Sequence, residues 1–303
     1  MSSQEELQKS EKLQKNDGKI YQVFQYLHLL RIKHYIKNVL IYVPLFFSGQ
    51  ILNKDKFGSA TLGTIVFCIG CSLVYVINDI KDVEKDKRHP EKCKRPIAAG
   101  AITKRSAYVL CVILVILILG ILFFTQIKWQ AGALLTIYIV INLGYSFGLK
   151  NVPILDVAIL SFGFLLRVVY GGIVGGVIVS VWLYLTVIAF SFYLGLGKRR
   201  NELRKIKSSE TRKVIEQYSD EFLDRNMYMC MALGLVFYSS WAVEKSRNFM
   251  WSIPLVLIIC MKYNLILEQD SEGDPVSTLF ASKSLMVMAA VYVIIAIISV
   301  YMG

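Results

Sequence analysis

Residues 57–77 read FGSATLGTIVFCIGCSLVYVI, and residues 78–100, which follow directly, read NDIKDVEKDKRHPEKCKRPIAAG. The first stretch contains no charged residue, whereas the second contains five acidic and seven basic residues. Because about 20 apolar residues in a helix cross the hydrocarbon of a bilayer, the first stretch predicts a transmembrane helix. The second stretch then places both signs of charge at one end of that helix.

The rest of the chain has the same apolar character, since 55% of its 303 residues are hydrophobic. A segment in lipid must satisfy its own backbone hydrogen bonds, which favours helices. We therefore predict an all-α protein, a polytopic membrane helical bundle with about nine transmembrane helices. The predicted spans are residues 36–51, 58–79, 106–125, 129–147, 154–174, 178–196, 226–243, 249–267 and 282–302. A polar N-terminal tail, residues 1–22, precedes a single transmembrane domain, residues 23–303.

Connections that are rich in Lys and Arg alternate along the chain with connections that contain few of them. The N-terminal segment and the connections 80–105 and 197–225 are basic, and the last two contain nine Lys and Arg each. Because such residues mark cytoplasmic loops, we expect a cytoplasmic N-terminus and, for an odd number of spans, a C-terminus outside. Basic loops that face anionic lipid account for much of the net charge of +12, so no nucleic acid is required as a partner.

The acidic residues after the second predicted span share one helix face. At 100° per residue, four side chains lie within about 100° of one another: Asn78, Asp79, Asp82 and Asp86. Like charges at this spacing repel, so the face needs counter-ions. Ordinary surface pairs with neighbouring bases are one interpretation, the bases being Lys81, Lys85, Lys87 and Arg88. The other is a Mg²⁺ ion, which takes carboxylate oxygens, water and substrate phosphates.

These residues resemble the first aspartate motif, NDxxDxxxD, of the UbiA prenyltransferase superfamily. With His89, Pro90 and the string KRPIAAG (94–100), the stretch is most similar to the decaprenyl-phosphate phosphoribosyltransferases of that superfamily. Five further segments resemble the same branch: HYIKNVLIYVPLFFSG (34–49), YSFGLKNVPILDVAILSFGFLLRVVYGG (145–172), GKRRNELRK (197–205), YSDEFLD (218–224) and KYNLILEQDSEGDP (262–275). The similarity covers most of the chain beyond residue 30.

The resemblance implies a membrane-embedded glycosyltransferase of UbiA-like fold. Such an enzyme moves 5-phosphoribose from phosphoribosyl diphosphate to a polyprenyl phosphate and releases diphosphate. The resemblance also implies Mg²⁺ as cofactor, a site that opens to the cytoplasm, and the inner (plasma) membrane of a bacterium, with a role in cell wall biosynthesis. The partners are then the two substrates and the lipid bilayer, and a homo-oligomer is compatible with the sequence.

The connection that follows the sixth predicted span supports a phosphate-rich donor. It begins with Lys198, Arg199, Arg200, Asn201 and Glu202, where related prenyltransferases place a second aspartate cluster. Phosphate groups need cations, and Arg and Lys supply forked and point-charge contacts respectively. A positive-inside cap on the span is the alternative interpretation of Lys198–Arg200.

We expect Asp79, Asp82 and Asp86 to hold Mg²⁺ and the donor diphosphate, with Asn78 orienting them. The candidate substrate-binding residues are Lys37, Lys94, Arg95, Tyr145, Lys150, Arg167, Lys198, Arg199 and Glu202. Several have simpler alternatives. Tyr145 and Lys150 are typical of an interfacial anchor, Lys94 and Arg95 could bind anionic lipid, and Arg167 could form a structural ion pair with Asp156, three helical turns away. The pattern gives no role to Asp220 and Asp224.

Two other functions fit parts of the pattern. A prenyltransferase with a prenyl diphosphate donor and an aromatic acceptor would use the same first motif. A transporter would place polar breaks near the membrane midplane in repeated halves, whereas the polar clusters here lie at the ends of predicted spans.

Overall fold

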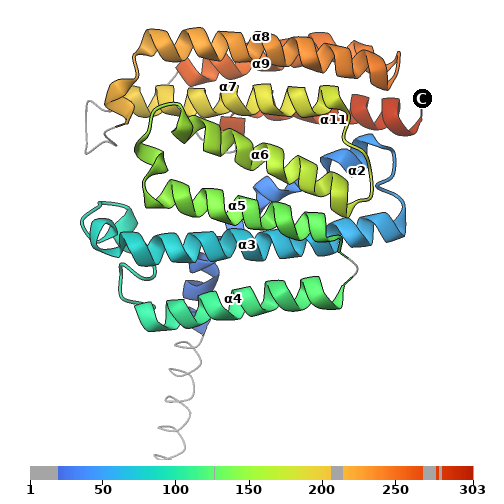
Figure 1. The fold of residues 1–303 in the computed structure, drawn as a ribbon. Helices are drawn as coiled ribbons and strands as arrows, with labels where there is room; N and C mark the ends of the chain where they lie inside the picture. Colours follow the sequence, from blue (N-terminus) through green and yellow to red (C-terminus); the bar gives the residue numbers. More distant parts are fainter. Residues whose placement is uncertain (1–19, 126, 206–213, 269–277, 280–281, 303) are drawn as a thin grey trace, which may run out of the picture. The chain divides into compact units, whose positions relative to one another are not determined.

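The computed structural model describes residues 20–125, 127–205, 214–268, 278–279 and 282–302. Within these ranges all regular elements are helices and no strand occurs, which confirms the predicted all-α class (Figure 1). The chain divides into two compact units, the first comprising Met1–Asn38 with Ile65–Gln126 and the second Val39–Thr64 with Ile127–Gly303. Most of the predicted tail, residues 1–22, lies outside the described ranges, and the single domain over residues 23–303 stays a prediction.

The first predicted span, residues 36–51, is not a continuous α-helix. The chain instead forms a 3₁₀ helix, η1 (Ile32–Tyr42), and a five-residue α-helix, α2 (Val43–Phe47). Pro44 lies in the first turn of α2, where its missing N–H is tolerated. Soon after α2 ends, Gly49 has a φ of 72°, a left-handed backbone conformation that residues other than glycine rarely adopt. The other eight predicted spans all fall on helices that are long and apolar enough to cross a membrane.

Helix α3 (Lys54–Asp86) contains the apolar stretch 57–77 and the first charged residues after it. It begins after Asn53, whose side-chain oxygen accepts hydrogen bonds from the N–H groups of Asp55 and Lys56, both at 3.1 Å, as an N-cap does. Its 33 residues correspond to a length of about 50 Å, whereas about 20 residues suffice to cross the hydrocarbon. The last turns of α3, with residues 78–86, therefore extend beyond its apolar part.

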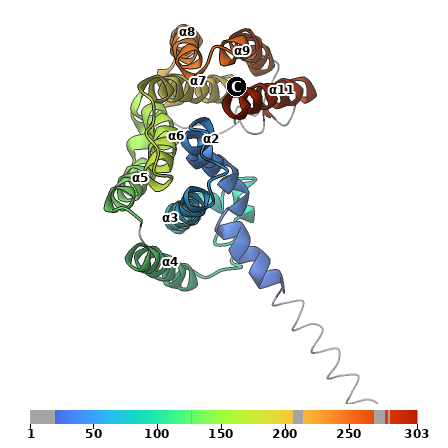
Figure 2. The same ribbon diagram turned by 90° about the vertical axis from the view of Figure 1, so that its right-hand side faces the viewer.

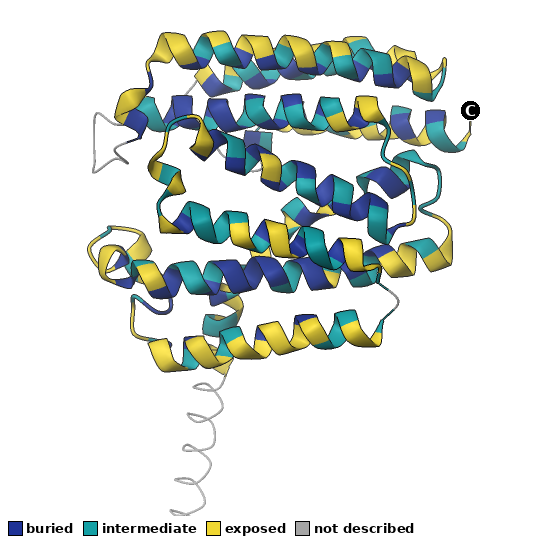
Figure 3. Ribbon diagram, viewed as in Figure 1, coloured by how far each residue is buried: buried dark blue, intermediate teal, exposed yellow. Residues whose placement is uncertain are grey.

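The first unit also contains a helix over residues 20–29, the short helix η2 (Lys92–Lys94) and helix α4 (Lys104–Phe124). Thr103 caps α4 by accepting a hydrogen bond from the N–H of Ser106 at 3.1 Å. In the most apolar part of α4, only 17% of the residues are buried, and exposed residues dominate this helix in Figure 3. An apolar helix surface of this kind is suited to contact with lipid.

The second unit contains six long helices: α5 (Trp129–Phe147), α6 (Leu155–Val174), α7 (Val181–Lys205), α8 (Asp220–Lys245), α9 (Ser252–Glu268) and α11 (Lys283–Tyr301). Each of α5 to α8 packs on the next helix in the chain, and α9 packs on α8 and α11 (Figures 1 and 2). A β-carbon on Gly171 of α6 would lie 1.9 Å from the carbonyl oxygen of Ile41. The glycine therefore permits close contact between α6 and η1.

Candidate active site

The polar end of α3 brings two of the predicted aspartates into one buried cluster. The side chains of Asp79 and Asp86 are 3% and 5% exposed, while Asn78 and Asp82 are half-buried and Glu84 is exposed. This distribution agrees with the shared helix face predicted from the sequence. A buried carboxylate requires a charged or hydrogen-bonded partner, and the partners identify what this face can bind.

Two arginines from distant parts of the chain pair with these aspartates. Arg95 Nη1 lies 3.1 Å from Asp79 Oδ1 and 2.7 Å from Asp86 Oδ2, so that one nitrogen bridges both carboxylates. Arg31 Nη2 lies 2.6 Å from the same oxygen of Asp79. The side chains of Arg31 and Arg95 are 19% and 23% exposed. Water and small solutes can therefore reach the cations from outside the unit.

Arg31 is held in place by its backbone and by an aromatic ring. It follows the helix over residues 20–29 and adopts a φ of 54°, a left-handed conformation that is uncommon for residues other than glycine. Its guanidinium lies 4.7 Å from the ring centroid of Tyr75, within the range of a cation–π contact. Sequence reasoning missed Arg31 because the first span was expected to begin only at residue 36.

The geometry bears on both interpretations of the acidic face. The surface pair of this region joins Lys87 to Glu84 at 3.3 Å, whereas Asp79 and Asp86 pair with arginines that are not sequence neighbours. In the described part of the chain, no three His, Cys, Asp or Glu side chains are grouped closely enough to hold a metal ion by themselves. Two carboxylate oxygens nevertheless converge on one nitrogen position, and Mg²⁺ commonly uses one or two carboxylates together with substrate phosphates. The oxygen donors fit that type of site.

Two predicted cations of the first unit lie at different depths. Lys94 is exposed on η2, next to Arg95, and Lys37 is half-buried on η1. Asn38, the neighbour of Lys37, is buried and donates a hydrogen bond to the sulfur of Cys68 at 3.0 Å. The remaining predicted residues belong to the second unit.

In the second unit, Arg199 of α7 is the centre of a buried network. Its side chain is 1% exposed, and its Nε lies 3.0 Å from Oδ2 of Asp156, which is fully buried. Its Nη1 contacts Glu202, which is 27% exposed, and its Nη2 donates to the hydroxyl of Tyr145 at 3.5 Å. Three predicted residues, Tyr145, Arg199 and Glu202, are thereby brought together. Asp156 has Arg199 as an ion-pair partner, a contact that sequence reasoning did not identify.

Tyr218 completes this network from the segment before α8. Its hydroxyl accepts a hydrogen bond from the N–H of Ile154 and donates one to Asp156 Oδ1, both at 2.6 Å. Ile154 has a φ of 68°, a strained conformation for a β-branched residue. Burial, and after it the hydrogen bond to Asp156, raises the pKa of the Tyr218 hydroxyl to about 12. Tyr218 therefore keeps its proton at neutral pH and donates a hydrogen bond to the carboxylate.

The other predicted residues of the second unit have separate environments. Arg167 of α6 is buried, donates to the Gly163 carbonyl at 2.6 Å and to the Tyr138 hydroxyl at 3.0 Å, and lies over the Tyr138 ring. Lys150 on η3 and Lys198 on α7 are half-buried.

Asp220 and Asp224, which had no role at the sequence level, occupy the first turns of α8. Arg200 of α7 is 6% exposed and donates to Asp224 Oδ2 at 3.1 Å, with Glu268 of α9 4.0 Å away. Asp224 therefore connects α8 to α7. Asp220 is exposed at the start of α8, where a negative charge interacts favourably with the helix dipole.

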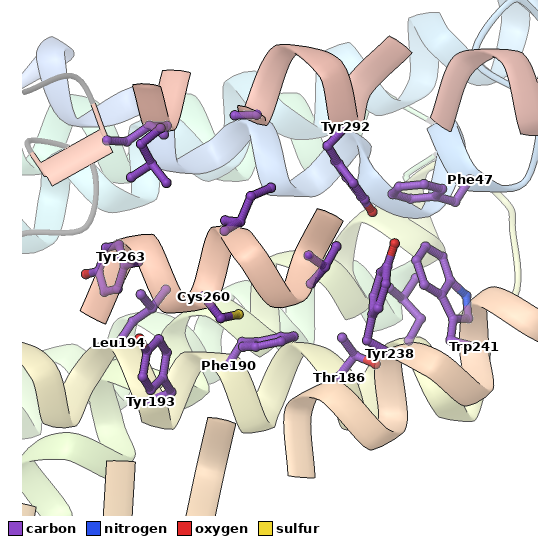
Figure 4. Close-up of a pocket in the computed structure, with 16 residues that line it drawn as sticks. Phe47, Thr186, Phe190, Tyr193, Leu194, Tyr238, Trp241, Cys260, Tyr263 and Tyr292 are labelled. Carbon is purple, nitrogen blue, oxygen red and sulfur yellow. The ribbon is translucent and has the colours of Figure 1, made fainter. Parts of the chain in front are cut away.

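The second unit also contains an apolar cavity of about 430 Å³ between α7, α8, α9 and α11 (Figure 4). Aromatic side chains dominate its labelled wall, among them Phe190, Tyr238, Trp241 and Tyr292. The hydroxyl of Tyr238 is hydrogen-bonded to Ser252 at 2.6 Å, so this polar atom is already satisfied. Such a wall is suited to an apolar ligand.

Comparison with known proteins places these features in context. The model of the UbiA prenyltransferase family matches residues 41–285. The chain is 31% identical to a decaprenyl-phosphate phosphoribosyltransferase of Corynebacterium glutamicum, over 90% of this chain and 85% of that protein. It is 34% identical to one of Mycolicibacterium smegmatis, over 72% and 70%. In fold it is similar to a UbiA homologue from Archaeoglobus fulgidus bound to GPP and Mg²⁺, with a TM-score of 0.71 and 18% identity over 91% of this chain and 99% of that chain.

Proposed function

This chain belongs to the UbiA prenyltransferase family and is a multi-pass membrane protein, and from that premise we propose that it transfers 5-phosphoribose from phosphoribosyl diphosphate to a polyprenyl phosphate. The observation that carries the proposal is the similarity to decaprenyl-phosphate phosphoribosyltransferases along 85% of the C. glutamicum protein. The acidic and basic side chains at the end of α3 support it, because a metal–diphosphate donor needs carboxylates and guanidinium groups in one place.

In this proposal the acidic face of α3 binds the donor diphosphate. Asp79 and Asp86 hold Mg²⁺ with Asp82 as a further ligand, and Asn78 orients them. The metal ion, when bound, neutralises the charge that develops on the leaving diphosphate. Arg31 and Arg95 lie within reach of the same carboxylates, and their forked N–H groups contact phosphate oxygens.

The reaction exchanges one oxygen substituent on the ribose. The bond between C1 and the diphosphate oxygen breaks, a bond from C1 to an oxygen of the acceptor phosphate forms, and diphosphate leaves with the bonding electrons. Positive charge develops on C1 and the ring oxygen, as in other glycosyl transfers. Because a phosphate monoester is already anionic at neutral pH, no strong general base is needed. The chain's own contribution is positioning and electrostatic stabilisation.

The remaining candidate residues have the following roles in this proposal. Lys150, Lys198 and Arg167 provide positive charge for phosphate groups, and Tyr145 and Glu202 provide uncharged and anionic contacts. The apolar cavity between α7, α8, α9 and α11 binds part of the polyprenyl chain. Lys37 and Lys94 add positive charge from the first unit.

We place the polar end of α3 in the cytoplasm. The connections after α3 and α7 are rich in Lys and Arg, which favours a cytoplasmic position. Seven of the helices that can cross a membrane follow α3, and an odd number places the C-terminus on the opposite side. This orientation requires residues 20–47 to cross the membrane if the N-terminus is cytoplasmic.

Purified protein in lipid nanodiscs tests the function. With Mg²⁺, radiolabelled phosphoribosyl diphosphate and decaprenyl phosphate, we expect label to move into the organic phase and diphosphate to appear in equal amount. Chelation of Mg²⁺ should stop both. Failure to label the lipid, together with consumption of a prenyl diphosphate in the presence of an aromatic acceptor, would show that the donor is a prenyl diphosphate.

A further inference from the structure

The buried network around Arg199 contains more polar groups than a simple ion pair requires. Exposure increases along it, from Asp156, which is fully buried, through Arg199 at 1% to Glu202 at 27%. The network therefore leads from the interior of the second unit to a carboxylate that solvent and ligands can reach. Sequence reasoning assigned Arg199 itself to substrate binding, but its position is internal.

Each of the three nitrogens of the Arg199 guanidinium faces a protein oxygen. Nε lies 3.0 Å from Asp156 Oδ2 as an ion pair, although the two atoms lack hydrogen-bond geometry. Nη1 contacts Glu202, and Nη2 donates to Tyr145 at 3.5 Å. Because the group is rigid and planar, a fixed orientation at Nε also fixes the directions of Nη1 and Nη2. The position of Asp156 thus determines where Glu202 and Tyr145 are held.

Asp156 is in turn oriented by Tyr218. One carboxylate oxygen faces Arg199, and the other accepts the Tyr218 hydroxyl proton at 2.6 Å. The same hydroxyl accepts the N–H of Ile154 at 2.6 Å, at a residue whose φ is 68°. A residue in a strained backbone conformation persists where its surroundings determine it fully. The carboxylate and the loop before α6 are therefore fixed by one hydroxyl.

Asp156 also influences the charge at Glu202, through Arg199. The positive charge of Arg199 is shared between two carboxylates, and the buried one, Asp156, balances it. Glu202 consequently keeps anionic character at its exposed end. Without Asp156, the full charge of Arg199 would act on Glu202, which would then be a weaker acceptor for a ligand.

We propose that Asp156 and Tyr218 are positioning residues, which hold Arg199 and, through it, fix the orientation of Glu202 and Tyr145 for substrate binding. This inference rests on the proposed function. Asp156 and Tyr218 do not contact substrate themselves, and Arg199 is a positioning residue rather than a phosphate ligand.

A double-mutant cycle tests this proposal. The variants are Asp156→Asn, Glu202→Gln and the combination of both, and the measurements are kcat and KM for phosphoribosyl diphosphate in nanodiscs. Each single change should lower kcat/KM by about 100-fold, as expected for misplaced groups. The kcat/KM of the double variant should be less than about 3-fold lower than that of Glu202→Gln, because the effects of residues in one network do not add. A purely structural role for Asp156 would instead give the product of the two single effects, which overturns the inference.

Because Asp156→Asn leaves the buried charge of Arg199 without its partner and destabilises the protein, Tyr218→Phe provides a second, milder variant. It should lower kcat/KM about 10-fold with little loss of folded protein. Combined with Glu202→Gln, it should cause little further loss of kcat/KM. Tyr228→Phe, on an exposed tyrosine of α8, is the matched control and should retain full activity. A Tyr218→Phe enzyme with wild-type kcat and KM overturns the inference. A wild-type protein that makes no lipid-linked phosphoribose overturns the proposed function as well, so the two failures are distinguishable.

Discussion

The cluster of carboxylates and arginines at the end of α3 and the cluster around Arg199 differ in their access to water. In the first, the cations Arg31 and Arg95 are 19% and 23% exposed. In the second, Arg199 is 1% exposed and its partner Asp156 is fully buried. A cation that water reaches can exchange its carboxylate for another partner more easily than one that is fully buried, because separating a buried pair leaves an uncompensated charge. The first cluster is therefore suited to binding a ligand and the second to holding shape.

The largest effect is expected from removing a carboxylate of the cluster at the end of α3. Asp86→Asn should lower turnover by about ten-thousandfold, equivalent to about 5 kcal/mol in the activation free energy, because a ligand of the proposed metal is lost. Initial rates of lipid labelling measure this change. Glu84→Gln, on an exposed acid of the same helix, is the control and should remain active. Wild-type-like rates for Asp86→Asn at saturating Mg²⁺ would remove the metal site from this cluster.

The two clusters should also differ in their contribution to the free energy of unfolding, and here the larger loss is expected in the cluster around Arg199. Asp156→Asn leaves Arg199 without its buried partner and should lower the free energy of unfolding by about 3–5 kcal/mol. Asp86→Asn should cost less, because its arginine partner is accessible to water. Thermal unfolding in detergent, followed by tryptophan fluorescence, gives both values under one condition. Equal destabilisation by the two variants would contradict the comparison.

A smaller effect is expected from the bridging arginine. Arg95→Gln should lower kcat/KM for the donor by about 100-fold, or about 2.7 kcal/mol, since it removes a phosphate contact. It should also strengthen binding of Mn²⁺ without donor, because Arg95 no longer competes for Asp79 and Asp86. Electron paramagnetic resonance of free Mn²⁺ measures the second change, and Arg88→Gln on an exposed base is the control. Weaker Mn²⁺ binding in Arg95→Gln would show that the arginine does not compete with the metal.

The smallest effect concerns the buried cluster at high pH. The pKa of Tyr218 is raised from 10.0 to about 12 in the folded protein, so the folded state retains the proton after the unfolded chain has lost it. The stabilisation is complete below pH 10 and is lost as the pH rises toward 12. Tyr218→Phe should therefore show a shallower fall in thermal stability between pH 10 and 12 than the wild type. Parallel curves would indicate that this hydroxyl titrates normally.

Local patterns in the sequence predicted the parts of the molecule that depend on local interactions. Apolar runs located eight spans, and helical periodicity located the shared face of Asn78, Asp79, Asp82 and Asp86. The segment 36–51 could not be predicted in this way, because its apolar residues favour a span while Pro44 and Gly49 favour a break. Hydrophobicity alone does not decide between them.

Contacts between distant segments were beyond the reach of these patterns. Arg31 lies 48 positions from Asp79, and Tyr218 lies 62 positions from Asp156, so no spacing rule connects them. Arg199 shows a related difficulty. Its type and its neighbours suggested a phosphate ligand, and only its burial shows that protein atoms occupy its nitrogens.

The length of α3 has a consequence for how the membrane acts on this protein. The helix runs without a break from Lys54 to Asp86, so the carboxylates and the apolar segment form one rigid rod. A hydrophobic stretch longer than the local hydrocarbon thickness adapts by tilting, and because the carboxylates continue the same helix, a tilt also changes their depth. A change in bilayer thickness should therefore change the depth of Asp79 and Asp86 relative to the membrane surface. Lipid chain length should then affect how easily water reaches these carboxylates.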